Sequence, residues 1–153
     1  MYTRGVSAYA ALRARRRTPD EAPVVYWCWG PTGSGKTRWC YEESPDAYWK
    51  NCSHKWWDGY DGRSDVILDD YRPDFCKFHE LLNLLDRYPY QVEVKGGTLN
   101  FSAKRIFITC PKAPADIWSS RTDEDIAQLL RRVTHVKDFS PEPQAVVPGF
   151  EAC

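Results

Sequence analysis

The stretch that decides the fold is Gly30-Pro31-Thr32-Gly33-Ser34-Gly35-Lys36-Thr37. It matches the pattern G-x-x-x-x-G-K-[ST] of a phosphate-binding loop. Glycines let the backbone turn sharply and bring its N–H groups close to a phosphate chain. Lys36 can reach the β- and γ-phosphates of a nucleotide, and the Thr37 hydroxyl can bind Mg²⁺. All eight residues are therefore candidates for binding a nucleotide, although the motif does not specify which one.

The segments on either side of this loop fit a strand–loop–helix unit. Residues 24–29 are apolar and aromatic, which predicts a buried strand. Residues 37–43 have the composition of a helix start. The unit predicts an α/β fold with the loop at the carboxyl end of its strand.

A second candidate segment is Val66-Ile67-Leu68-Asp69-Asp70. Three apolar residues predict a central strand that carries two acids at its carboxyl end. We expect Asp69 to hold Mg²⁺, directly or through water, and Asp70 to activate or orient an attacking water. The alternatives are a plain strand-to-loop boundary, a helix cap, or a metal site without a nucleotide. The three histidines are far apart in the sequence, and we expect them to be structural or exposed.

Composition narrows the class of protein. The chain has 153 residues, which predicts one domain, and 42% of them are hydrophobic. No apolar run approaches the roughly 18 residues of a membrane-spanning helix, and the N-terminus lacks a signal-peptide core. Six cysteines without C-x-x-C pairs argue against a zinc ribbon or a disulfide framework, so we expect free thiols in a reducing compartment.

Charge is unevenly distributed along the chain. Residues 1–17 contain five arginines and no acid, so the remainder carries 16 basic and 21 acidic side chains. We expect residues 1–23 to form a basic arm or linker, with a helix over 7–17 that binds nucleic acid, directs nuclear import or simply presents a solvated face. An acidic body does not suggest a broad nucleic-acid surface, so any such contact is expected from the basic arm or from a small local patch.

The rest of the chain alternates strand and helix patterns. We expect residues 24–139 to form the domain and residues 140–153, with three prolines, to form a loose tail. Expected strands are 47–50, 66–68, 91–94, 99–101, 105–109 and 133–139, with the pair around Lys95-Gly96-Gly97-Thr98 forming a hairpin. Expected helices are 78–85 and 123–131, the second with Ile126, Leu129 and Leu130 facing inward.

Four segments in this order resemble one known family. They are residues 30–37, Lys55-Trp56-Trp57-Asp58-Gly59-Tyr60, Leu68-Asp69-Asp70, and residues 86–97, which begin Asp86-Arg87-Tyr88-Pro89 and end Lys95-Gly96-Gly97. The resemblance is to the superfamily 3 helicase domain of the replication-initiator proteins of circular single-stranded DNA viruses, circoviruses above all, and it covers roughly residues 2–139. It implies an AAA+-like P-loop NTPase fold: a three-layer α/β sandwich with a mostly parallel central sheet and a β-hairpin insertion.

The resemblance also implies an activity and partners. Residues 30–37 would be the Walker A motif and Leu68-Asp69-Asp70 the Walker B motif of an ATP- and Mg²⁺-dependent helicase, with Lys36 and Asp70 in catalytic roles. The protein would assemble as a hexameric ring on single-stranded DNA, in the host nucleus if it is viral, and not at a membrane. A tight double-glycine hairpin tip would touch DNA through Lys95, Gly96 and Gly97, with Lys104 or Arg105 as weaker candidates. Otherwise Lys95 is only a solvated lysine on a tight turn.

Two further features have competing interpretations. Arg131 or Arg132 is the candidate arginine finger for a neighbouring subunit's ATP, although arginines also suit the negative end of a helix. Trp56 and Trp57 can stack on a base, but packing of a loop or an interface is the favoured interpretation.

The sequence departs from the family pattern in two places. The family ends an apolar strand with an Asn that senses the γ-phosphate, whereas Thr109, Cys110 and then Pro111 occupy this place here. Pro111 has no polar side chain and no N–H, so a nucleotide-binding, DNA-holding protein with little turnover is the alternative function, unless Thr109 or Cys110 partly substitutes. Residues 1–29 contain no histidine, so we expect the family's HUH endonuclease domain to be absent and the chain not to nick or join DNA.

Overall fold

The computed structural model describes residues 16–118 and 121–140. The predictions that concern residues 1–15 and 141–153, including most of the basic arm and the tail, lie outside these ranges. Arg16 and Arg17 lie in irregular structure, so the prediction of a helix reaching Arg17 is wrong at its last two residues.

The strands and helices expected from residue 24 onward are all present, with bounds within two residues of the expected ones. The strands are β1 (Val24–Trp29), β2 (Tyr48–Asn51), β3 (Asp65–Asp69), β4 (Gln91–Val94), β5 (Gly97–Asn100), β6 (Arg105–Cys110) and β7 (His135–Asp138). The helices are α2 (Lys36–Glu43), α3 (Phe78–Leu84) and α4 (Asp123–Arg132). None of these helices is long and apolar enough to cross a membrane.

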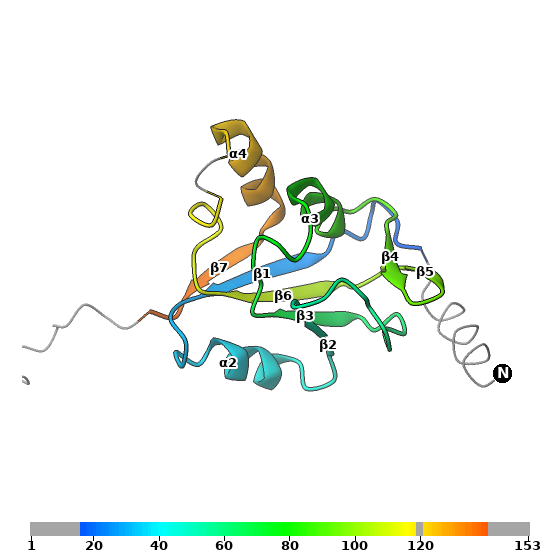
Figure 1. The fold of residues 1–153 in the computed structure, drawn as a ribbon, viewed down its shortest axis with the longest axis horizontal. Helices are drawn as coiled ribbons and strands as arrows, with labels where there is room; N and C mark the ends of the chain where they lie inside the picture. The colour runs from blue at the N-terminus through cyan, green and yellow to red at the C-terminus, as the bar shows by residue number, and fades with distance from the viewer. Residues whose placement is uncertain (1–15, 119–120, 141–153) are drawn as a thin grey trace, which may run out of the picture.

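The central sheet is parallel throughout. Its strand order is β2-β3-β6-β1-β7, and every neighbouring pair runs in the same direction. α2 covers one face, while α3 and α4 cover the other (Figure 1). The expected three-layer α/β sandwich with a mostly parallel sheet and a hairpin insertion is confirmed.

Burial on both faces explains why the central strands are continuous apolar runs. In β1, Val25 and Trp27 face the α3 and α4 side, while Cys28 faces α2. In β3, Val66 and Leu68 point to the first side and Ile67 to the second. Alternate side chains of a strand point to opposite faces, so a strand covered on both sides needs apolar residues at every position.

A hairpin of β4 and β5 extends from one end of the sheet. Its tip is Lys95-Gly96, and Gly96 adopts a φ of 98°, a left-handed conformation that favours glycine. The loop of residues 55–60, which precedes β3, supports the hairpin through two hydrogen bonds. The backbone N–H of Trp57 donates to the Glu93 carbonyl over 2.8 Å, and the backbone N–H of Lys95 donates to Asp58 Oδ1 over 3.1 Å.

Trp57 is buried and packs against the rings of Tyr48, Tyr60 and Phe101. The packing interpretation is confirmed for this residue. Trp56, beside it, is half-buried, and the Lys55 ammonium lies 4.7 Å from the centre of its ring.

α4 differs from expectation at one position. Leu129 is buried and Ile126 half-buried, but Leu130 is 42% exposed, so the prediction that Leu130 faces inward is wrong. Leu130 lies about 100° around the helix from Leu129. The apolar stripe formed by Ile126, Leu129 and Val133 is too narrow to include it.

The segment before β1 is anchored by one buried arginine. Arg17 is 2% exposed, and its guanidinium donates to the carbonyls of Leu84 (2.8 Å), Asn83 (2.5 Å) and Tyr88 (2.6 Å). Burial lowers the pKa of Arg17 to about 10, although the charge of Asp86 opposes this change. The contacts with Leu84 and Asn83 supply donors to the last carbonyls of α3, which have no partner within the helix.

We expect Arg17→Ala to lower the free energy of unfolding by about 2 kcal/mol, because buried carbonyls lose their donors. Urea unfolding followed by tryptophan fluorescence measures the change. The matched control is Arg16→Ala, since Arg16 is exposed and should change stability by no more than about 0.5 kcal/mol. Equal effects of the two substitutions would contradict the anchoring role.

Candidate functional site

The phosphate-binding loop joins the carboxyl end of β1 to the start of α2. Gly33 and Gly35 have φ of 83° and 94°, and a Cβ atom at either would meet nothing within 4 Å. Glycine is therefore required by the backbone conformation and not by crowding. The open space beside both residues lets a ligand approach the main chain.

The start of α2 suits an anion. Its N-cap is Gly35, no side chain caps it, and its first turn has no acidic residue. The free N–H groups and the positive end of the helix dipole point out of such an end. Lys36 Nζ donates to the Pro31 carbonyl over 3.2 Å, and Ser34 Oγ is buried without a hydrogen-bond partner among the described residues. Unused donors around the loop fit a phosphate group.

Folding brings the loop to the first of the two acids. Thr37 Oγ1 donates to Asp69 Oδ1 over 3.3 Å, across 32 residues of sequence. Mg²⁺ in nucleotide sites commonly binds one or two protein oxygens together with phosphates. Within residues 16–118 and 121–140 no cluster of three or more His, Cys, Asp and Glu side chains offers another metal site. The Thr37 hydroxyl and the Asp69 carboxylate are oxygen donors of the kind that Mg²⁺ prefers, so this pair fits the metal expected from the sequence.

The second acid is held by Thr109, which lies near the end of β6 and is 1% exposed. Its hydroxyl accepts the Asp70 N–H over 2.7 Å and donates to Asp69 Oδ1 over 3.2 Å. Asp70 has a φ of 57°, a rare conformation for a residue with a side chain. The Asp70 carboxylate is 65% exposed and pairs with Arg72 over 2.9 Å.

The sequence pattern indicates Thr109 only as a partial substitute for the missing Asn, and it indicates no role for Arg72. The bonds of Thr109 depend on the pairing of β3 with β6, which the sequence does not specify. An arginine two residues after an acid is common in surface loops and gives no signal of its own.

Pro111 directly follows β6, and the residues before it are already engaged. The buried Cys110 accepts the Gly30 N–H at its carbonyl over 3.2 Å. The Thr109 hydroxyl is committed to the two acids. The end of β6 therefore holds the phosphate loop and the segment Asp69–Asp70 through hydrogen bonds. Pro111 itself adds no hydrogen-bond donor.

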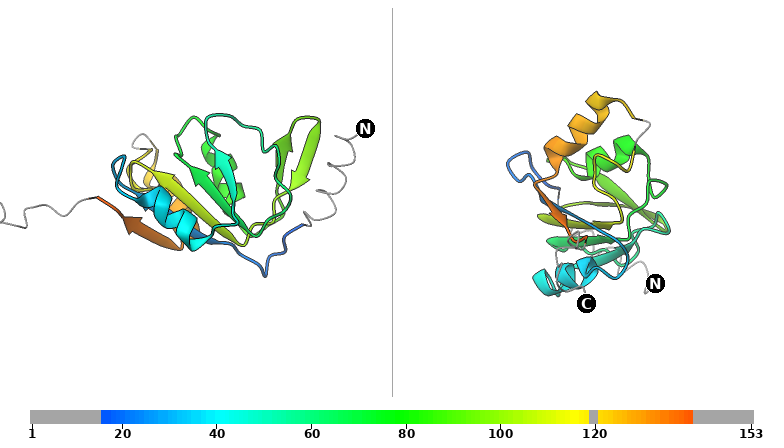
Figure 2. Two further views of the ribbon diagram at one scale, coloured as in Figure 1. Left: turned by 90° about the horizontal axis from the view of Figure 1, so that it is seen from below. Right: turned by 90° about the vertical axis from the view of Figure 1, so that its left-hand side faces the viewer.

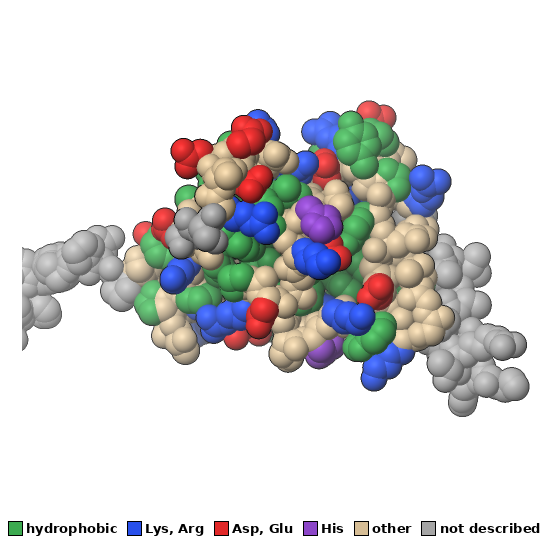
Figure 3. Space-filling view, turned by 45° about the horizontal axis from the view of Figure 1, so that its top comes forward, with side chains coloured by type: hydrophobic (Ala, Val, Ile, Leu, Met, Phe, Trp, Pro, Cys, Tyr) green, Lys and Arg blue, Asp and Glu red, His purple; other side chains and the backbone are tan. Residues whose placement is uncertain are grey.

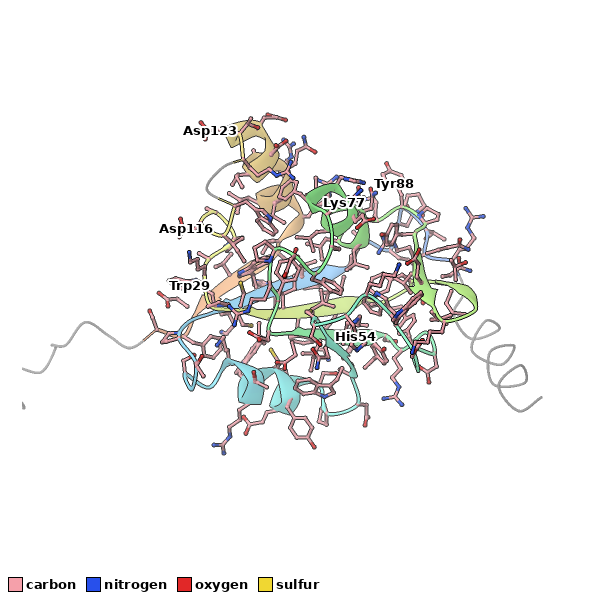
Figure 4. All side chains as sticks on the ribbon, in the orientation of Figure 1. Trp29, His54, Lys77, Tyr88, Asp116 and Asp123 are labelled. Carbon is pink, nitrogen blue, oxygen red and sulfur yellow. The ribbon has the colours of Figure 1, made fainter. Side chains whose placement is uncertain are left out.

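The candidate DNA-binding residues lie at the other end of the sheet. The hairpin that carries Lys95, Gly96 and Gly97 projects from the end opposite to the phosphate loop (Figures 1 and 2). Trp29 directly precedes the loop and Tyr88 lies near the base of the hairpin, and the two side chains stand on opposite sides of the molecule (Figure 4). Lys104 is exposed and directly precedes β6, so it shares the end of the hairpin.

Charge on the surface fits a local contact. Over the face drawn in Figure 3, Lys and Arg side chains are interspersed with acidic ones and do not form a continuous patch. The three histidines are exposed and separate in the sequence; His135 stacks on Tyr26 with ring centres 5.0 Å apart.

The two candidate finger arginines have different surroundings. Arg132 is 24% exposed; it donates to Asp86 Oδ2 over 3.0 Å and to the Gln128 carbonyl over 2.8 Å. Burial opposes ionisation of Asp86, but the Arg87 N–H and the Arg132 guanidinium outweigh it and lower the pKa of the Asp86 carboxyl. Arg131 is 64% exposed, with Glu124 at 3.7 Å. Arg131 is therefore the freer of the two.

We expect Thr109→Val, which keeps the shape but removes the hydroxyl, to lower the free energy of unfolding by about 1–2 kcal/mol, because the partly buried hydrogen bond from the Asp70 N–H is lost. Urea unfolding measures this loss. Thr109→Ser retains the hydroxyl and serves as the control. A valine variant as stable as the serine variant would show that these hydrogen bonds do not support the acidic segment.

Comparison with known proteins agrees with the geometry. A family model described as RNA helicase matches residues 26–111, a range that contains the phosphate loop, both acids and the hairpin. The match covers more than half of the chain.

Relatives are found among viral replication-associated proteins. Those of porcine circovirus 1, beak and feather disease virus and goose circovirus are 39%, 44% and 37% identical to this chain, over 86%, 86% and 98% of its length. The chain spans only 42%, 44% and 50% of those relatives. The family match and these identities together show that the chain belongs to the superfamily 3 helicase-domain family of circovirus-type replication-associated proteins.

Proposed function

We propose that the chain is an ATP-dependent DNA helicase module of a viral replication initiator. The observation that carries this proposal is the hydrogen bond from Thr37, at the end of the phosphate loop, to Asp69. Asp70 is the next residue in the chain. This arrangement supplies a phosphate cradle, two oxygen ligands for Mg²⁺ and a further carboxylate in one place.

Each group at this site has a role in the proposed reaction. The N–H groups of residues 30–37 bind the phosphates, and Lys36 leaves the Pro31 carbonyl to join them. Thr37 and Asp69 would hold Mg²⁺, which would supply positive charge to neutralise the phosphates. Asp70 orients the attacking water and accepts its proton, while the bond from the γ-phosphorus to the leaving oxygen of ADP breaks.

We propose that the ATP site is completed by a neighbouring copy in a ring. Arg131 is the preferred finger, because it is exposed and can reach another subunit. Arg132 is the weaker candidate, since its guanidinium is engaged by Asp86 and Gln128 of its own chain. A hexameric ring and action in the host nucleus follow from the family resemblance and complete the proposal.

The hairpin is the proposed contact to single-stranded DNA. Lys95 and Lys104 offer charge to phosphates, and Gly96 and Gly97 let the backbone come close. β6 runs from the hairpin end to the phosphate end over six residues, or about 20 Å. Together with β3 it offers a rigid connection between the proposed DNA contact and Asp69.

Steady-state ATPase assays with and without single-stranded DNA test this function. We expect DNA to stimulate turnover, Asp70→Asn to lower kcat by about a hundredfold because the carboxylate no longer accepts a proton, and Lys36→Ala to be at least as severe. Asp74→Asn is the control, since Asp74 is exposed in the loop after β3. Full turnover in both site variants would contradict the proposal.

Pro111 favours one alternative function, a nucleotide-binding oligomer that holds DNA with little turnover. The same assay decides between the two. Ordinary turnover by the unaltered chain would exclude this alternative, whereas slow turnover that rises in Pro111→Asn would support it.

Binding of labelled oligo-dT at several salt concentrations tests the hairpin. We expect Lys95→Ala to weaken binding and to reduce the slope of log affinity against log salt by about 0.7, the value for one phosphate contact on a single strand. Lys112→Ala is the matched control, because Lys112 is exposed near the phosphate end of the sheet. Equal losses in the two variants would contradict a DNA contact at the hairpin.

A further inference from the structure

Arg72 forms an ion pair with Asp70 beside the candidate nucleotide site. A contribution to the stability of the fold does not explain this pair. Its Nη2 lies 2.9 Å from Asp70 Oδ1, and the two side chains are 51% and 65% exposed. Ion pairs this exposed contribute about 0–1 kcal/mol to stability. The partner of Arg72 is nevertheless the carboxylate proposed to act on the attacking water.

The backbone that carries Arg72 is firmly placed. The Asp70 N–H donates to the Thr109 hydroxyl, and the Tyr71 N–H donates to the Thr109 carbonyl over 2.7 Å. Tyr71 is fully buried and packs against Trp27. The left-handed conformation of Asp70 costs roughly 1 kcal/mol, so this turn is held by its surroundings. Arg72 therefore extends from a fixed point, while its side chain remains free to turn.

Arg72 lies at the same end of the sheet as the phosphate loop, because its partner Asp70 follows Asp69, and Asp69 Oδ1 accepts from Thr37 Oγ1 over 3.3 Å. Burial raises the pKa of the Cys110 thiol, and among the groups that modulate it are the charges of Arg72, Asp70 and Lys36. Cys110 also accepts the Gly30 N–H at its carbonyl. The end of β6 is thus hydrogen-bonded to the start of the phosphate loop through Cys110 and to the segment that carries Arg72 through Thr109.

The end of β6 offers no free donor to a terminal phosphate. The Thr109 hydroxyl proton is directed at Asp69, Cys110 is buried, and Pro111 has no N–H. A donor to that phosphate in addition to Lys36 has to come from another segment at this end of the sheet. Arg72 has a planar guanidinium whose paired N–H groups match the geometry of phosphate oxygens.

We propose that Arg72 binds the γ-phosphate of ATP held by its own chain. Without nucleotide its guanidinium rests on Asp70; with ATP it turns to the phosphate and leaves the Asp70 carboxylate for the attacking water. This assignment rests on the nucleotide site of the proposed function, but it does not require hydrolysis.

Binding of ATPγS and of ADP, each with Mg²⁺, tests the assignment. We expect Arg72→Ala to weaken ATPγS binding about tenfold, which corresponds to about 1.4 kcal/mol, and ADP binding by less than about twofold. Arg72→Lys should lie between, since a lysine keeps the charge without the paired geometry. Thermal unfolding checks that all variants remain folded.

The matched control is Arg63→Ala. Arg63 is also exposed and paired with an aspartate, Asp61, at 3.4 Å, but it lies before the amino end of β3. It should leave the binding of both nucleotides unchanged. An unchanged ratio of ATPγS affinity to ADP affinity in Arg72→Ala would overturn the assignment. Faster ATP turnover by Arg72→Ala than by the unaltered chain would also overturn it, because the ion pair would then be an inhibitory contact.

The outcomes separate this assignment from the ATPase proposal. A chain that loses ATPγS selectivity in Arg72→Ala but hydrolyses no ATP keeps the assignment and contradicts the ATPase. A chain with ordinary turnover whose Arg72→Ala variant still prefers ATPγS contradicts the assignment alone. Failure of the unaltered chain to bind either nucleotide overturns both.

Discussion

All neighbouring strands of the central sheet run in the same direction, and the placement of the candidate nucleotide site follows from that constraint. Parallel strands put their carboxyl ends at one edge, so the loop after β1, the acids at the end of β3 and the end of β6 meet although they are distant in sequence. The opposite edge receives the amino ends and the hairpin that precedes β6. The candidate nucleotide site and the candidate DNA contact are consequently separated by the length of the strands.

Within the candidate site, one buried hydroxyl connects the parts. Thr109 accepts from the backbone of Asp70 and donates to the carboxylate of Asp69, which in turn accepts from Thr37. A hydroxyl is suited to this position because it donates and accepts at once. This chain of contacts holds the exposed Asp70 in a strained turn, where its carboxylate pairs with Arg72.

Packing also decides which basic residues are available to a partner. Arg17 belongs to the basic N-terminal run, yet its guanidinium is used up by the end of α3. Arg132 is similarly engaged by Asp86, whereas Arg131 is exposed one position away. The number of arginines therefore overestimates the positive charge that is accessible to DNA or to a neighbouring subunit. Some guanidinium groups instead donate hydrogen bonds to backbone carbonyls inside the fold.

The sequence by itself determined the phosphate loop, the apolar strand ending in Asp69 and Asp70, the double-glycine hairpin and the α/β class, because local turn chemistry and unbroken apolar strands encode them. The sequence pattern overestimated the width of the apolar stripe on α4, which does not include Leu130, and the length of the N-terminal helix, which does not reach Arg17. Contacts with other segments decide the exposure of Leu130 and the conformation of Arg17. Only the tertiary structure decided that Thr109 joins the two acids and that Arg72 rests on Asp70. These contacts cross from β6 to β3 and depend on strand order, which no local pattern in the chain specifies.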